Sequence, residues 1–156
     1  MARQKPAPRP VITQLPDFGK VPPQALDMEE AVLGAIMLEK EAVIAILDIL
    51  KPASFYKEAH QKIFKAITDL SMREYPVDLY TVTEELRIHN DLDSVGGPVY
   101  LTQLTSKVVS AANVDYHARI VAQKYIQREL IRASTEIPNR SFDDSIDVTE
   151  LLDFSE

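Results

Sequence analysis

The stretch SAANVDYHARIVAQKYIQRELIRASTEIP, residues 110–138, decides the fold because its composition is that of a long helix. Side chains in a helix turn by about 100° per residue. On that spacing Tyr116, Ile120 and Ile131 lie apart from a broad apolar group that covers half the circumference, while Lys124 and Arg128 mark a solvated side. A helix that packs on one core has a narrower apolar stripe than this. The broad group consists of Ala118, Val121, Ala122, Tyr125, Ile126, Leu130, Ala133 and Ile137.

Two arrangements explain a helix with two apolar sides. The helix either packs on its own head and hairpin partner while a second molecule covers the rest, or it lies centrally in a bundle. A hairpin of two helices buries too little apolar surface to be stable alone, so the first arrangement requires a neighbouring molecule. The periodicity of the sequence does not choose between the two arrangements.

The remaining apolar spacing is helical throughout, and no alternating pattern of useful length predicts a strand. We therefore expect an all-α protein in three parts. Residues 1–21 form a disordered, basic, proline-rich arm, and residues 22–110 form a globular head of about five to six helices. Residues 111–156 form a protruding antiparallel helical hairpin whose last helix is truncated, since it stops without a C-cap.

Local signals place several helix boundaries. Asp78 is a natural N-cap for LYTVTEELRIH, and Pro98 suits the first turn of a short helix after Gly96-Gly97. Asn113 caps the long helix, and Pro138 begins the turn that ends it. The segment from Ala42 to Leu50 is nearly all apolar, which predicts a deeply buried helix.

Composition narrows the class of function. The 156 residues carry a net charge of −7, and residues 1–20 alone carry a net charge of +3. The remaining residues hold 13 basic and 23 acidic side chains, so the folded part repels a phosphate backbone and nucleic acid is not expected to bind it directly. The absence of cysteine fits a reducing, cytoplasmic compartment, and no apolar run is long enough to cross a membrane.

The residues that usually carry catalysis are missing. The sequence contains no phosphate-binding G-x-x-x-x-G-K-[ST] motif and no pair of histidines at metal-binding spacing. His60, His89 and His117 lie in three separate segments, and His60 is expected to be an internal hydrogen-bond partner. We therefore predict no catalytic, metal-binding or cofactor-binding residue, and an interaction domain is the default interpretation.

Five segments in series resemble the N-terminal domain of the bacterial replicative DNA helicase, the DnaB family. The segments are PPQALDMEEAVLGAIML, LKPASFYKEAHQKIFKAI, PVDLYTVTEEL, GGPVYLTQL and SAANVDYHARIV, in that order, and the resemblance covers about residues 21–156. The second matches the family's K-P-x-x-F-Y-x-x-A-H-x-x-I-F-x-A-I pattern at Lys51, Pro52, Phe55, Tyr56, Ala59, His60, Ile63, Phe64, Ala66 and Ile67.

The resemblance implies a non-catalytic collar domain. In this family six such domains form a collar above a motor ring as a trimer of dimers, with paired hairpins at one dimer contact. The collar docks the C-terminal domain of primase, while ATP, magnesium and DNA bind the motor domain, which this sequence does not contain. By position in the family, Tyr100, Ile131 and Ile137 correspond to primase or collar contacts, and the angular argument adds Tyr116 and Ile120 as partner-binding candidates.

Other functions stay open at this point. The chain could be a free-standing helical module that binds nucleic acid through its basic arm, although its acidic body argues against that. It could also be the related helicase-binding domain of primase, although the segment FYKEAHQKIF favours the helicase side. An enzymatic function has no candidate catalytic residues to support it.

Overall fold

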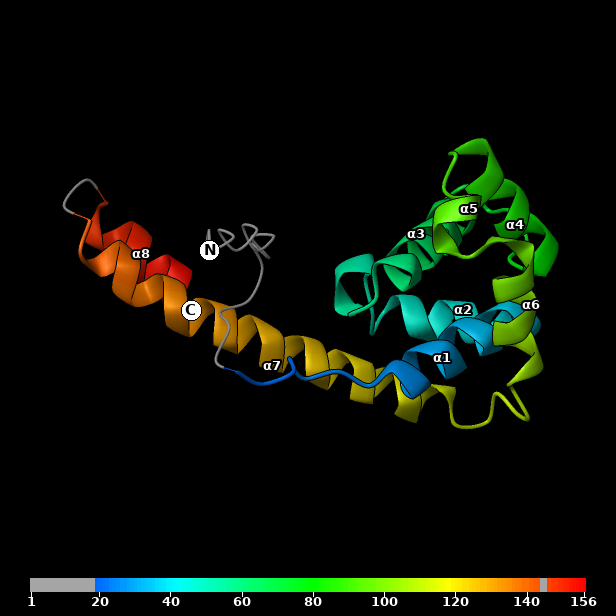
Figure 1. Ribbon diagram of the computed structural model, residues 1–156, viewed down its shortest axis with the longest axis horizontal. Helices are drawn as coiled ribbons and strands as arrows, with labels where there is room; N and C mark the ends of the chain where they lie inside the picture. Colours follow the sequence, from blue (N-terminus) through cyan, green and yellow to red (C-terminus); the bar gives the residue numbers. More distant parts are fainter. Residues whose placement is uncertain (1–18, 144–145) are drawn as a thin grey trace, which may run out of the picture. The chain divides into compact units, whose positions relative to one another are not determined.

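The structure, a computed structural model, describes residues 19–143 and 146–156. In this part of the chain every regular element is helical and no strand occurs, which confirms the predicted all-α class (Figure 1). The predicted disordered arm lies almost wholly outside the described residues. The elements are α1 (Leu26–Leu38), α2 (Lys40–Leu47), the 3-10 turn η1 (Pro52–Ser54), α3 (Glu58–Met72), α4 (Leu79–Ile88), α5 (Leu92–Val95), α6 (Gly97–Ser106), α7 (Val114–Ser141) and α8 (Val148–Ser155).

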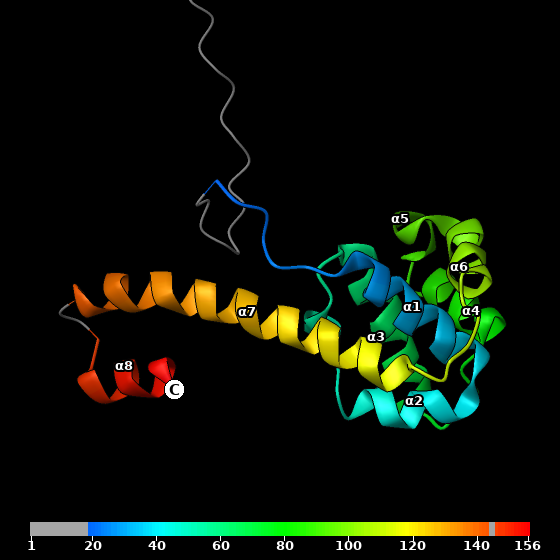
Figure 2. The same ribbon diagram turned by 90° about the horizontal axis from the view of Figure 1, so that it is seen from below.

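The chain divides into two compact units. One unit, Pro23–Gln127, holds α1 to α6 and the first half of α7, and we call it the head. The other includes Arg128–Glu156, in which α8 runs back beside the end of α7 as an antiparallel hairpin (Figure 2). A boundary near residue 110 stays a prediction, since the first half of α7 groups with the head.

The head is held together by one apolar core. Buried side chains recur at helical spacing on α3, which turns one stripe inward, whereas α1 is buried at every position from Val32 to Met37. Ala118 and Val121 of α7 are buried in the same core, which ties the start of the long helix to the head. The largest fully buried apolar side chains are Leu33, Ile36, Ile46, Phe55, Ile63, Phe64, Ile67, Leu86, Leu101 and Leu104.

Helices α1 and α6 approach closely at Gly34. A β-carbon built on Gly34 would overlap the carbonyl oxygen of Leu104 and would lie 2.6 Å from a methyl group of Val108. The missing side chain therefore allows the backbone of α6 to lie against α1.

Two predicted boundaries are confirmed. Asp78 caps α4: its carboxylate accepts from the backbone N–H of Thr81 at 2.8 Å, while the Thr81 hydroxyl accepts from the Asp78 N–H at 2.9 Å. Pro98 is the second residue of α6, whose N-cap Gly96 lies in the left-handed region at φ 112°. In the hairpin, Asp147 caps α8 by accepting from the N–H of Thr149 at 2.7 Å, and this bond lowers the pKa of the Asp147 carboxyl.

Three expectations for individual segments are wrong. Helix α2 is only partly buried, because Ile44 is 73% exposed and only one side of this helix meets the core. Arg128 is buried and not on a solvated side of α7. Helix α7 continues past Pro138 to Ser141, because the carbonyl oxygens of Ile137 and Pro138 accept bonds from Ser141 and Phe142.

The position of Pro138 inside α7 leads to a testable prediction. Proline has no N–H to donate to the carbonyl four residues earlier, and its ring crowds that carbonyl. We expect Pro138→Ala to stabilise the last turns of α7 by about 1–3 kcal/mol. Amide hydrogen exchange of residues 135–141 should become slower, whereas Asn139→Ala, an exposed neighbour, should change it little. Unchanged or faster exchange in Pro138→Ala would contradict this prediction.

Candidate docking surfaces

A buried hydrogen-bond chain links three helices of the head. Glu29 of α1 is 1% exposed and His60 of α3 is 0% exposed, and Glu29 Oε1 lies 2.8 Å from His60 Nδ1. His60 Nε2 lies 2.6 Å from the hydroxyl of Tyr100 on α6. The rings of His60 and Tyr100 are nearly parallel, with centroids 6.0 Å apart. The predicted role of His60 as an internal hydrogen-bond partner is confirmed.

The carboxylate of Glu29 also binds the beginning of α3. Its Oε2 accepts from the Tyr56 N–H at 2.8 Å, and its Oε1 accepts from the Lys57 N–H at 3.4 Å. These backbone groups precede α3 and have no carbonyl partner within that helix. The carboxylate therefore satisfies two backbone donors and lies at the positive end of the helix dipole, where a negative charge stabilises the helix.

One assignment of hydrogen atoms gives every bond in the chain from Glu29 to Lys57 a donor and an acceptor. Where Glu29 accepts, His60 Nδ1 donates to it, and in that tautomer His60 Nε2 is an acceptor. The Tyr100 hydroxyl then donates to His60 Nε2, and its oxygen accepts from Lys57 Nζ at 3.3 Å. Lys57 Nζ also lies 4.6 Å from the centre of the Tyr100 ring, so the exposed ammonium is held over an aromatic face.

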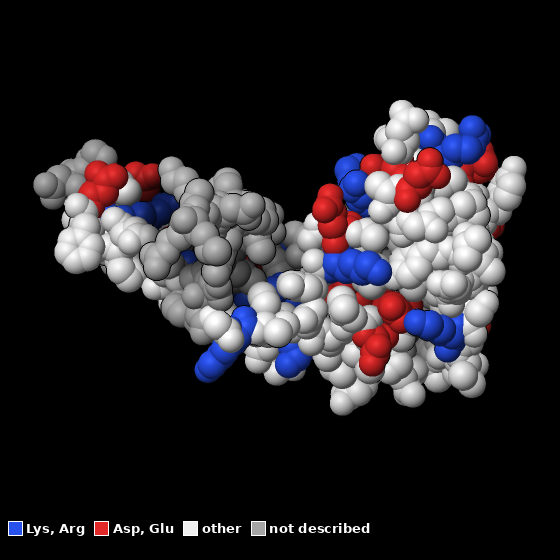
Figure 3. Space-filling model, in the orientation of Figure 1, with Lys and Arg blue, Asp and Glu red and all other residues white. Residues whose placement is uncertain are grey.

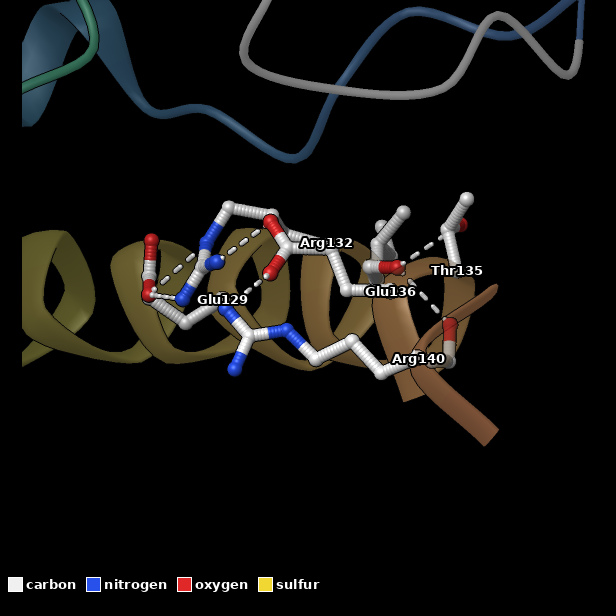
Figure 4. Close-up of polar contacts among 7 residues, drawn as sticks. Glu129, Arg132, Thr135, Glu136 and Arg140 are labelled. Atoms are coloured by element: carbon white, nitrogen blue, oxygen red, sulfur yellow. Dashed lines mark hydrogen bonds and ion pairs between the residues drawn. The ribbon is translucent and has the colours of Figure 1, made fainter. Parts of the chain in front are cut away.

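The hairpin carries a charged network on α7. Arg132 donates to Glu129 at 2.9 Å and to Glu136 at 2.7 Å, and Glu136 pairs with Arg140 at 3.7 Å (Figure 4). The hydrogen bonds from Glu129 and then Glu136 raise the pKa of Arg132 further above its usual range. Arg140 lies 4.0 Å from the ring centre of Phe154, which ties α8 to α7.

The five residues predicted to bind partners lie on two helices. Tyr100 is a half-buried residue of α6, and the other four lie along α7. Tyr116 is 66% exposed, while Ile120, Ile131 and Ile137 are half-buried, so none of the four is sealed inside this chain. Tyr116 and Ile120 belong to the head unit and Ile131 and Ile137 to the hairpin unit, and their role in binding stays a prediction.

The described residues also bear on two other kinds of function, metal binding and membrane insertion. In residues 19–143 and 146–156 no group of three histidine, cysteine, aspartate or glutamate side chains is placed to hold a metal ion. Among the same residues, no helix has both the length and the apolar character that a membrane span requires.

The family model for the DnaB-like helicase N terminal domain matches residues 21–123 of this chain, about the same stretch as the head. The chain belongs to the DnaB-like helicase N-terminal domain family. The resemblance drawn from the five sequence segments is thereby confirmed.

Known helicases are similar to this DnaB-like domain over most of its length. The replicative DNA helicase DnaB of Rhodothermus marinus is 50% identical over 135 residues, which are 86% of this chain and 14% of that protein. The replicative DNA helicase DnaB of Geobacillus stearothermophilus is 46% identical over 136 residues, which are 86% of this chain and 30% of that protein. The chain thus spans less than a third of either helicase.

Solved structures show the same fold. The N-terminal domain of DnaB helicase from Mycobacterium tuberculosis has a TM-score of 0.78 at 40% identity, over 86% of this chain and 95% of that one. A DnaB-like replicative helicase, studied for its interactions with primase, has a TM-score of 0.72 at 26% identity, over 85% of this chain and 32% of that one. The domain described here therefore has the fold of the N-terminal domain of DnaB helicases.

Sequence reasoning missed two residues of the DnaB-like domain. The carboxylate of Glu29 binds the start of α3 and His60, a contact that no motif in the sequence indicated. Lys57 drew no attention, although it holds Tyr100. Glu29 and Tyr100 are 71 residues apart in the chain, and no pattern in a single sequence indicates that folding brings them together.

Proposed function

We propose that this DnaB-like domain holds the subunits of a replicative helicase together and docks the C-terminal domain of primase. The proposal extends what is known of one similar structure, a DnaB-like helicase that was studied for its interactions with primase. It makes the domain part of the collar of a hexameric helicase, with DNA and ATP bound by a motor domain elsewhere.

The exposed apolar surface of the hairpin carries this proposal. Helix α8 has no buried residue, and Leu152 on it is 60% exposed. Leu130 of α7 is 64% exposed, and Phe142 and Val148 near the turn are 87% and 70% exposed. Two helices that leave this much apolar surface in water gain stability when another molecule covers it. A second hairpin supplies matching apolar surface, and the residues proposed for this contact are Ile131 and Ile137.

Self-association tests the hairpin contact. We expect sedimentation velocity to show concentration-dependent dimers, and Ile131→Asp to weaken them by about tenfold or more, because a charge enters an apolar contact. Ile120→Asp should act in the same direction. Ile88→Asp is the matched control, because Ile88 is a 65% exposed isoleucine of α4 outside the hairpin. A wild-type chain that stays monomeric at high concentration would contradict pairing through the hairpin. So would an Ile88→Asp variant whose dimer is weakened as much as that of Ile131→Asp.

Binding of primase is a separate measurement. The chain should form a complex with the C-terminal domain of primase in a titration followed by fluorescence anisotropy. Tyr100→Ala, Tyr116→Ala and Ile137→Ala should weaken that complex if these residues contact primase. Failure of the wild-type chain to bind would overturn primase docking and would leave self-association standing.

A further inference from the structure

The surface around Tyr100 has two features that are typical of a protein contact. Helix α6 contains no aspartate, glutamate, lysine or arginine, and Figure 3 shows an uncharged area over this helix at the right-hand side of the head. Depletion of charge is typical of the centre of a protein interface. Next to Tyr100 the same helix forms an open hollow of about 470 Å³, lined by Pro98, Val99, Thr102, Gln103, Ser106 and Lys107.

The ammonium group of Lys57 lies at the edge of this uncharged surface. Lys57 is exposed, yet its ammonium is held over the Tyr100 ring at 4.6 Å and bonded to the Tyr100 hydroxyl at 3.3 Å. Elsewhere in the head Lys62, Arg73 and Lys107 each pair with a carboxylate. Within the described part of the chain Lys57 pairs with none, so its charge is not neutralised by a neighbour.

The buried chain beneath Tyr100 fixes this arrangement. His60 and Glu29 hold the Tyr100 hydroxyl from inside, so the ring cannot turn without breaking a 2.6 Å hydrogen bond. An ammonium ion has three N–H groups, and Tyr100 takes one of them. Two donors of Lys57 therefore stay available on a cation whose position is already set. A ligand that uses them loses little side-chain freedom on binding.

We infer that Lys57 and Tyr100 form a receptor for an acidic side chain on the partner protein that docks on α6. The occupant is a helix that lays a small apolar face on the hollow beside Val99 and Gln103 and places a carboxylate on Lys57. Gln103 lies one turn beyond Tyr100, so one helix of a partner reaches both places. The inference rests on the proposed function in one respect, since it takes primase to be that partner.

The experiment compares Lys57→Met with Lys40→Met in binding to the C-terminal domain of primase. Methionine keeps an unbranched apolar stem and removes the charge, and Lys40 is an exposed lysine with no ion pair among the described residues, which makes it a matched control. We expect Lys57→Met to weaken binding about tenfold at low salt and Lys40→Met to weaken it less than about twofold. Lys57→Arg, which keeps a cation over the ring, should restore most of the affinity.

Salt separates charge from packing. The difference between wild type and Lys57→Met should shrink at about 0.5 M salt, where exposed charges are screened within a few ångströms. Equal affinity of wild type and Lys57→Met at low salt, or a difference that does not change with salt, overturns the acidic receptor and leaves primase docking intact. A wild-type chain that does not bind primase overturns both. Because Lys57 is exposed, its variants should keep the thermal stability of wild type, and this is measured first.

Discussion

Replacing Glu29 with alanine is expected to lower the free energy of unfolding of the head by about 3–5 kcal/mol. The carboxylate is 1% exposed and accepts from His60 Nδ1 at 2.8 Å and from the Tyr56 N–H at 2.8 Å. Alanine removes the acceptor that the buried His60 ring and the part-buried Tyr56 N–H share, and an unsatisfied buried group costs about 1–3 kcal/mol. Chemical denaturation followed by circular dichroism measures the change.

Two further variants make this test specific. Glu29→Gln keeps the shape and one acceptor, and His60 can adopt its other tautomer to accept from the new amide, so we expect a loss of only about 1–2 kcal/mol. Glu30→Ala is the matched control on the same helix. Glu30 pairs with the exposed Lys107 at 2.7 Å, and such a surface pair contributes at most about 1 kcal/mol. If Glu29→Ala and Glu30→Ala lower the free energy of unfolding by the same amount, the buried network does not stabilise the head.

Gly34→Ala is expected to destabilise the head by about 2–3 kcal/mol, even though alanine favours a helix over glycine by about 1 kcal/mol. The new β-carbon would overlap the Leu104 carbonyl oxygen and would lie 2.9 Å from the Leu104 carbonyl carbon. Both atoms belong to the backbone of α6 and cannot rotate away. The two helices must therefore move apart, which opens gaps beside Leu33 and Leu101 in the core.

An alanine-to-glycine substitution at an exposed helix position is the control for helix propensity. Ala45→Gly, at an exposed position of α2, should cost about 1 kcal/mol with no packing change. Val108→Ala in the Gly34→Ala background should recover part of the loss, because one clash of the new β-carbon is with a Val108 methyl group. A Gly34→Ala variant as stable as wild type would show that α1 and α6 do not pack as closely as described.

Much of the fold could be predicted because it depends on local physics. The helical period of apolar residues predicted an all-helical chain, and Asp78 and Pro98 acted at the positions that capping and fixed backbone angles require. Pro138 failed as a helix end because it lies in the last turn of α7, where little helix remains to be broken and the next residues still find acceptors. The apolar run of α2 misled for a related reason: composition reports how apolar a segment is, and not how many of its sides meet a neighbour.

The helical period of the chain was enough to specify an all-helical fold, and five short segments were enough to place it in the DnaB-like helicase N-terminal domain family. These properties are carried by neighbours within a few turns of one another. The hydrogen-bond chain from Glu29 to Tyr100, the close approach at Gly34 and the placement of the Lys57 ammonium over the Tyr100 ring depended on folding. Each of them joins helices that are far apart in the chain, and hydrogen bonds and steric contacts act over a few ångströms of space, whatever the distance along the sequence.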